Sequence, residues 1–144
     1  MFGPHLILEG YNCNKRLLGD VGYLYRALNE YPPRIGMHMI MPPHVQQYLE
    51  RSKTEWGLSG FVIIAESHIA IHTFPTLGFA TLDVFSCRDF DCESAIDFFV
   101  EKFKVGNYKH IMLNRGEDYP KDRLKSLELV SSEREKISAA VSAL

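Results

Sequence analysis

The sequence predicts an α+β domain, a two-layer sandwich in which a largely antiparallel sheet has its helices packed on one face. Strand candidates follow one another between residues 59 and 86 with only short turns between them, which is typical of antiparallel pairing. Segments in which apolar residues recur at helical spacing lie before and after this run. Strands mixed with a few helices in this way indicate the α+β class.

The first elements are a strand and a helix. Residues 5–11 have the apolar character of a buried strand. Asn14 is a good N-cap for a helix over residues 15–30, where apolar residues recur at helical spacing: Leu17, Leu18, Val21, Leu24, Tyr25 and Leu28. Because the residue before a proline avoids the helical conformation, Pro32 and Pro33 are expected to end this helix.

The middle of the chain is broken by a second pair of prolines. Residues 35–41, rich in methionine, are expected to form another strand. Pro42 and Pro43 then interrupt the chain, and a loop or short helix is expected over residues 44–57. Residues 59–65, 68–74 and 79–86 are the strands of the central run. The last two of these strands are expected to form a hairpin around residues 75–78.

The last third of the sequence predicts two helices and one strand. Asp91 is a suitable N-cap for a helix near residues 92–104. Its inward-facing residues are expected to be Ala95, Ile96, Phe99 and Phe103. Residues 108–113 follow as a strand candidate, and residues 128–143 form a weakly amphipathic helix candidate.

Length and composition limit the class of protein. At 144 residues, the chain is expected to form one domain over residues 1–144. A net charge of −2 gives no basic field for nucleic acid. The three cysteines, Cys13, Cys87 and Cys92, have neither an even count nor metal-ligand spacing, which suggests a reducing compartment. Since the sequence has no signal-peptide pattern and no apolar run near the roughly 20 residues of a membrane span, a cytoplasmic location without membrane association is expected.

The stretch ESHIAIH at residues 66–72 is the most informative part of the chain, together with Cys87. It places Ser67 beside an acid at the start of an apolar strand, with His72 five residues further on. A serine is a weak nucleophile alone and needs a neighbouring base or donor. The pattern therefore points to chemistry on Ser67, directed either at a substrate or at the chain's own peptide bond.

This motif belongs to a longer pattern. Ser59-Gly60 precedes an apolar strand, and the sequences HTFPT and DVFSC follow at residues 72–76 and 83–87. The pattern closely resembles that of the small prokaryotic S-adenosylmethionine decarboxylases, the pyruvoyl-dependent enzymes of spermidine synthesis. Weaker similarities lie at residues 5–9 and 114–116, so the resemblance spans most of the chain.

The resemblance implies that the chain cuts itself between Glu66 and Ser67 into fragments 1–66 and 67–144. Ser67 would attack the carbonyl of Glu66 to give an ester, and loss of the α proton would leave a dehydroalanine that hydrolyses to a pyruvoyl group. This pyruvoyl group, generated from Ser67, would be the cofactor. It would form a Schiff base with the amine of a small-molecule substrate and draw electrons from the bond to the carboxylate.

The resemblance also implies roles for individual residues. His72 would remove the α proton of Ser67, and Ser59 would stabilise the oxyanion of the acyl shift. Cys87 would return a proton to the substrate carbon after carbon dioxide leaves. Glu9 is similar to an N-terminal acid that contacts the substrate. Because the family is an obligate dimer, a homodimer of processed protomers is expected, with the second subunit covering the other face of the sheet.

Two positions depart from the family pattern, which reads HTWPE. Phe74 replaces the tryptophan and can still stack on adenine. Thr76 replaces a glutamate that binds the ribose hydroxyls, and it cannot make that charged contact. S-adenosylmethionine is the expected substrate, with arginine or ornithine as the alternative for the same chemistry. A non-catalytic paralogue that regulates an active partner is a further alternative, against which the intact catalytic residues argue.

Other sites can be drawn from the same residues. Strand alternation puts His68 and His72 on one face, but four residues of strand span about 13 Å, too far for one zinc ion, so no metal is expected. Ser67, His72 and Asp83 could form a hydrolase triad, but no Gly-x-Ser-x-Gly elbow surrounds Ser67.

Overall fold

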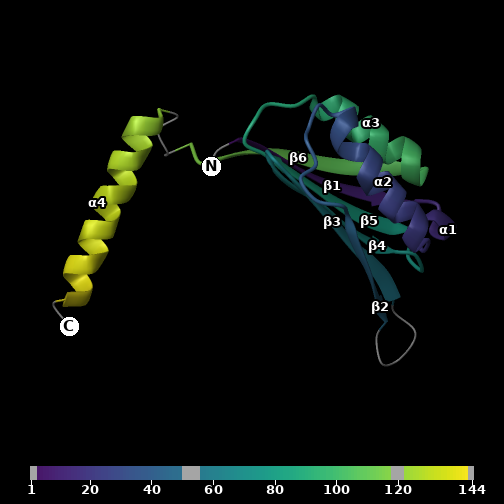
Figure 1. Cartoon of the computed structure of the whole chain (residues 1–144). Helices are drawn as coiled ribbons and strands as arrows, with labels where there is room; N and C mark the ends of the chain where they lie inside the picture. Colours follow the sequence, from purple (N-terminus) through teal and green to yellow (C-terminus); the bar gives the residue numbers. More distant parts are fainter. Residues whose placement is uncertain (1–2, 50–55, 118–121, 143–144) are drawn as a thin grey trace.

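The computed structural model describes residues 3–49, 56–117 and 122–142. The strands are β1 (Gly3–Tyr11), β2 (His44–Leu49), β3 (Trp56–Ile64), β4 (Ser67–Phe74), β5 (Phe79–Ser86) and β6 (Asn107–Arg115). The helices are α1 (Lys15–Leu18), α2 (Val21–Arg34), α3 (Cys92–Phe103) and α4 (Arg123–Ser142). The strands form one six-stranded sheet in the order β2-β3-β4-β5-β1-β6, and every neighbouring pair is antiparallel. Helices α1 to α3 lie on one face of this sheet, whereas α4 stands apart from it (Figure 1), so the predicted α+β sandwich is confirmed.

The core lies between the sheet and its three covering helices. Along β1, burial alternates residue by residue, and Leu6 and Leu8 are fully buried. Phe99 of α3 is buried on the same side, and the Tyr31 hydroxyl of α2 donates to the Ala95 carbonyl at 2.6 Å. The predicted strand over residues 5–11 is confirmed, and its alternation shows that only one of its faces meets the helices.

The helix expected over residues 15–30 is two helices, so that prediction was wrong in its continuity. Asn14 does act as an N-cap, because its side chain accepts from the backbone N–H groups of Arg16 and Leu17. The chain then turns at Gly19, where a Cβ would lie 2.5 Å from the Trp56 ring. Asp20 is extended and caps α2 by accepting from the Tyr23 N–H at 2.8 Å. The sequence does indicate this break, because Asp20 is a second capping residue that follows closely after Asn14.

The proline pair lies inside the last turn of α2 rather than after it, so the predicted helix end was wrong. Proline lacks the N–H that would bond one turn back, which usually breaks a helix. Here Tyr31 and Pro32 are buried in the core, and packing holds the turn. The N–H groups of Ile35 and Met37 both donate to the Pro32 carbonyl, at 3.2 and 2.9 Å, and close the helix end.

The strand expected over residues 35–41 is not formed, and the loop or short helix expected over residues 44–57 is partly strand. Met39 makes only an isolated antiparallel bridge to Ile64. Residues 44–49 are the edge strand β2, paired with β3, and residues 56–57 open β3. Residues 50–55 lie outside the described residues. Sequence reasoning missed β2 because its outward residues are polar, and its register depends on pairing with β3.

The remaining predicted elements are formed, with bounds that differ by a few residues from the predicted ones. Strands β3, β4 and β5 pair in succession, and β4 and β5 form the expected hairpin around residues 75–78. Asp91 caps α3 through the N–H groups of Glu93 and Ser94. All the residues of α3 expected to face inward are buried. The strand expected over residues 108–113 is β6, and the expected C-terminal helix is α4, which begins five residues earlier than predicted.

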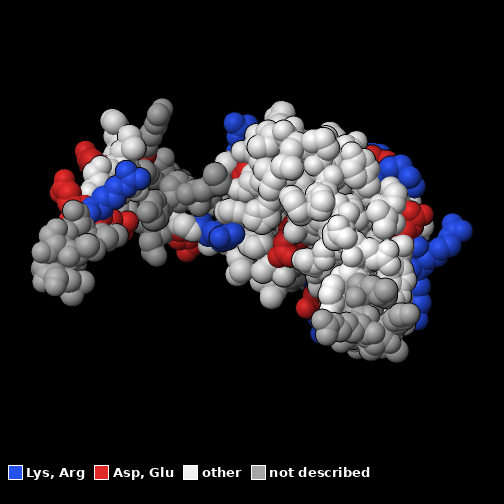
Figure 2. All heavy atoms as spheres, turned by 60° about the horizontal axis from the view of Figure 1, so that its bottom comes forward, with Lys and Arg blue, Asp and Glu red and all other residues white. Residues whose placement is uncertain are grey.

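The other face of the sheet carries no helix from the described elements α1 to α3. Its outward-facing side chains mix apolar residues with four of the predicted site residues, Glu9, Ser59, His72 and Phe74. Phe61, Phe74, Ile111 and Leu113 are exposed there. Figure 2, with the bottom of the Figure 1 view brought forward, shows a largely uncharged surface with scattered charged residues. We call the face of the sheet opposite helices α1 to α3 the open face. Among the described residues, no helix has the length and apolar character that a membrane crossing requires.

Candidate active site

The peptide bond between Glu66 and Ser67 lies at the exit of a tight turn. Ile64 pairs with Ser67 across β3 and β4, which leaves only Ala65 and Glu66 to connect the strands. Two-residue hairpins favour turn types that need a positive φ at one or both connecting residues. Neither Ala65 nor Glu66 has one, and the positive φ falls instead on Ser67, at 156°. The turn is therefore not of the favoured kind, and Ser67 has a backbone conformation that is rare outside glycine.

The carbonyl of Glu66 is polarised by the neighbouring strand. The backbone N–H of Cys87 donates to it, with 2.8 Å between nitrogen and oxygen. Cys87 follows Ser86, which pairs with Ser67 across β4 and β5. This donor was missed in the sequence because it is a backbone group. The pairing of β4 with β5 in the right register would have revealed it.

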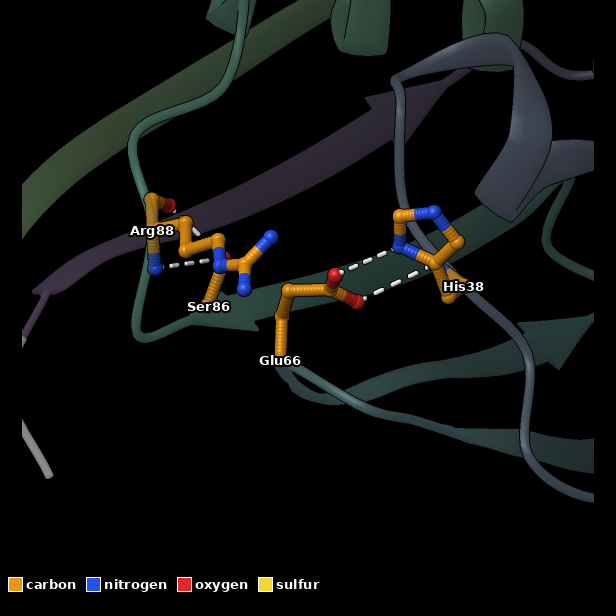
Figure 3. A network of polar contacts seen from close by, with 4 residues as sticks. All are labelled: His38, Glu66, Ser86 and Arg88. Atoms are coloured by element: carbon orange, nitrogen blue, oxygen red, sulfur yellow. Dashed lines mark hydrogen bonds and ion pairs between the residues drawn. The ribbon is translucent and has the colours of Figure 1, made fainter.

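The side chain of Glu66 is buried and held by His38 (Figure 3). The backbone N–H of His38 donates to Oε2 at 3.1 Å, and Nδ1 of His38 lies 2.9 Å from Oε1. Since an ionised carboxylate only accepts, Nδ1 carries the proton. The side-chain hydrogen bond from His38 holds the pKa of Glu66 below its ordinary value, against the opposing effect of burial.

The segment that carries Cys87 is fixed by Ser86. Its buried hydroxyl donates to the Arg88 carbonyl at 2.7 Å and accepts from the Arg88 N–H at 3.0 Å, as Figure 3 shows. These bonds form a small closed loop around Cys87. Cys87 itself is exposed, so its backbone is held in place while its thiol remains accessible.

A second group of predicted site residues lies at the other end of β4. Ser59 and His72 face each other across β3 and β4, and Oγ of Ser59 is hydrogen-bonded to Nδ1 of His72 at 2.9 Å. A cavity of about 530 Å³ opens beside them. Its walls are Tyr48, Trp56, Gly57, Leu58, Ser59, His72, Thr73, Phe74, Thr76 and Leu77.

Glu9 and Phe74 belong to this second end. Glu9 pairs with Thr81, which pairs with His72, so all three lie in one row across the open face. The hydroxyl of Tyr11 donates to Oε2 of Glu9 at 2.5 Å and fixes the carboxylate. Phe74 stacks on Phe79, with 5.6 Å between ring centroids, and lines the cavity.

Within one chain, the structure does not bring the two groups together. Ser67 and His72 lie on the same extended strand, and five residues at the rise of a β-strand separate them by about 17 Å. Cys87 lies at the Ser67 end and Ser59 at the His72 end. The same separation leaves the hydrolase triad unassembled, and Asp83 lies 3.3 Å from His5 instead. Among the described residues, no cluster of three or more histidine, cysteine or acidic side chains is arranged to hold a metal.

Comparison with known proteins places this arrangement in a family. The family model described as S-adenosylmethionine decarboxylase matches residues 4–116, which include both ends of β4 and every predicted site residue. The chain belongs to the S-adenosylmethionine decarboxylase family. Helix α4 lies beyond the matched region.

Relatives named S-adenosylmethionine decarboxylase proenzyme agree with this assignment. The Pyrobaculum arsenaticum protein is 41% identical over 101 residues, which cover 69% of this chain and 77% of that protein. The Pyrococcus horikoshii protein is 36% identical over 110 residues, with 76% and 74% covered. The Archaeoglobus fulgidus protein is 33% identical over 115 residues, with 79% and 97% covered. The crystal structure of the adenosylmethionine decarboxylase from Aquifex aeolicus has the same fold, with a TM-score of 0.65, 23% identity, and coverage of 83% of this chain and 93% of that one.

Thr76, where the decarboxylase pattern has glutamate, lies in the wall of the cavity. The ammonium group of Lys15 donates to the Thr76 carbonyl at 2.8 Å. A glutamate at this position would carry a negative charge, whereas Thr76 is neutral and lies beside the positive charge of Lys15. A substrate that binds in the cavity meets aromatic and small polar groups from the described lining residues, but no carboxylate.

Proposed function

We propose that this chain is a self-processing, pyruvoyl-dependent decarboxylase that acts on S-adenosylmethionine in spermidine synthesis. Its family membership supports the reaction, and the proenzyme names of its relatives support self-processing. The observation that carries the proposal is the turn at Glu66-Ser67. There the carbonyl to be attacked already accepts a hydrogen bond from Cys87, and the attacking residue follows it in a strained backbone conformation.

Self-cleavage would begin with an acyl shift. Oγ of Ser67 bonds to the carbonyl carbon of Glu66, the peptide C–N bond breaks, and the hydroxyl proton ends on the freed nitrogen. Negative charge develops on the Glu66 oxygen during this step, where the N–H of Cys87 is already placed to stabilise it. Strain at Ser67 favours the step because cleavage releases the residue from its uncommon φ.

The pyruvoyl group that Ser67 would become supplies an electron sink for decarboxylation. Cys87, exposed beside the turn, is placed to give the substrate carbon its proton. A cytoplasmic location, as expected from the sequence, would keep this thiol reduced. Glu9, held by Tyr11, and Phe74, at the cavity, would contact the substrate from the other group.

The separation of the two groups supports a homodimer. If two open faces pack on each other about a two-fold axis that runs across the strands, the Ser67 end of one β4 meets the His72 end of the other. Each active site would then take Ser67 and Cys87 from one protomer, and Ser59 and His72 from its partner. Exposed Phe61, Ile111 and Leu113 would supply apolar area for this contact.

Mass spectrometry of the purified protein tests the proposal. We expect fragments 1–66 and 67–144, with a pyruvoyl group at the start of the second. The Ser67→Ala variant should remain whole, because it has no nucleophile. A wild-type chain that stays intact with an unmodified Ser67 after long incubation would falsify self-processing.

A further inference from the structure

The turn that contains the scissile bond is held from outside the hairpin. Residues 37–40, which follow α2, run beside the end of β3. The N–H of Ala65 donates to the His38 carbonyl at 2.8 Å, and the N–H of Ile40 donates to the Ile63 carbonyl at 3.1 Å. His38 adds two bonds to the carboxylate of Glu66. Through its backbone and its side chain, His38 thus holds both residues of the turn, Ala65 and Glu66.

This support matters because the turn sequence does not provide its own. Alanine and glutamate lack the conformational freedom of the glycine or asparagine that two-residue hairpins favour. Glu66 is only 3% exposed, and a buried carboxylate is costly unless it is hydrogen-bonded. The His38 side chain, by contrast, is 72% exposed. It contributes little to the core, and within the described part of the chain its side chain is hydrogen-bonded to Glu66.

We propose that His38 is a positioning residue for self-cleavage, which holds Glu66 so that its carbonyl stays against the N–H of Cys87 while Ser67 attacks. This inference rests on the proposed self-processing. Two anchors then fix Glu66, His38 at its carboxylate and Cys87 at its carbonyl. Without the bond from the His38 ring, the carboxylate keeps only the bond from the His38 backbone N–H, so Glu66 is held less firmly and its carbonyl should leave its donor for part of the time. The depressed pKa of Glu66 agrees with a carboxylate that stays ionised for this bond at neutral pH.

The test compares rates of self-cleavage in His38→Ala and His38→Asn, followed by pulse-labelled translation and gel separation of the fragments. Loss of a hydrogen bond to a charged group should slow the alanine variant about tenfold or more. The asparagine amide can place an N–H close to the position of Nδ1, so this variant should recover to within about threefold of the wild-type rate. His110→Ala, an exposed histidine of β6 outside the site, is the matched control and should cleave normally.

A double-mutant cycle separates positioning from a general structural role. Glu66→Ala removes the group that His38 holds, so adding His38→Ala to it should slow cleavage no further. Circular dichroism of each variant in a Ser67→Ala background checks that the chain folds. A His38→Ala chain that cuts itself at the wild-type rate would overturn the role of His38 alone, and so would full additivity in the cycle. An uncut wild-type chain would overturn self-processing and the role of His38 with it.

Discussion

At its first residue, β4 follows a tight turn whose polar groups are bonded to neighbouring backbone and to His38. At its last residues it borders a cavity of about 530 Å³ beside the hydrogen-bonded pair of Ser59 and His72. The first end has the hydroxyl of Ser67, the hydrogen-bonded carbonyl of Glu66 and the accessible thiol of Cys87. The second has the imidazole of His72, the hydroxyl of Ser59 and the cavity. Each end therefore has what the other lacks.

Under the proposed mechanism, this difference divides the reaction between two places on one small sheet. Antiparallel pairing fixes each group firmly but also holds the two groups about 17 Å apart along the strand. Movement within one sheet cannot close that gap without breaking the strand pairing. In the proposed homodimer, a second copy would close it with no change in either sheet.

Mixing two inactive variants should have the largest effect. Ser67→Ala and His72→Ala chains, each expressed alone, should not complete cleavage, and His72→Ala should stall as an ester that hydroxylamine splits. When the two are co-expressed, heterodimers should contain one site with Ser67 from one chain and His72 from the other. Mass spectrometry should then find pyruvoyl only on the His72→Ala chain. Absence of any cut chain in a confirmed heterodimer would show that the two ends do not act across an interface.

The Cys87→Ala change separates cleavage from turnover. Its backbone N–H remains and can still donate to Glu66, so the chain should cut itself to a useful extent. The lost thiol should slow decarboxylation by about 100-fold or more, since general acid catalysis contributes factors of that size. Release of labelled carbon dioxide measures the effect, with Cys92→Ala as the control. Unchanged turnover would remove the thiol from the mechanism.

Thr76→Glu tests the binding surface at the second end. A carboxylate there should restore a charge-assisted bond to ribose, and kcat/KM for S-adenosylmethionine should rise by about tenfold. Thr76→Gln is the matched control without charge. Lys15, which bonds the Thr76 carbonyl, is near enough to compete for the new carboxylate, so Lys15→Met should enlarge the gain. Arginine and ornithine should be assayed in parallel. Release of carbon dioxide from one of these amino acids and not from S-adenosylmethionine would identify that amino acid as the substrate. The proposed chemistry at Glu66 and Ser67 would be unaffected.

A small pH effect should be confined to the first end. Because the folded-state pKa of Glu66 is lowered, its contribution to stability is complete above the ordinary value of 4.5 and is lost as the pH falls through the lower folded value. In a Ser67→Ala background, Glu66→Gln should therefore reduce the free energy of unfolding at pH 6, and the difference should shrink on acidification. Urea unfolding at several pH values measures it. A loss of stability in Glu66→Gln that grows toward low pH would contradict the lowered pKa of Glu66.

The sequence was more informative about residue types than about their distances. Alternation in β4 correctly placed His68 and His72 on one face of the sheet, opposite the buried Ile69 and Ile71, because a period of two is a local property. The separation of Ser67 from His72 follows from the same strand geometry. The contacts of Glu66 with His38 and Cys87 depend instead on non-local pairing. Strand β2 was missed for a similar reason, since an edge strand with polar outward residues has little local signal.

The strand order has a consequence for the molecule after it has been cut. A break at residue 66 would assign β1, β2 and β3 to one piece and β4, β5 and β6 to the other. In the sheet, β1 lies between β5 and β6, and β3 lies against β4, so the two pieces are interleaved rather than side by side. The two fragments cannot separate without breaking the backbone hydrogen bonds on both sides of β1. Maturation would thus leave a noncovalent heterodimer of fragments that behaves as one body, in which the broken peptide bond is a change of chemistry and not of architecture.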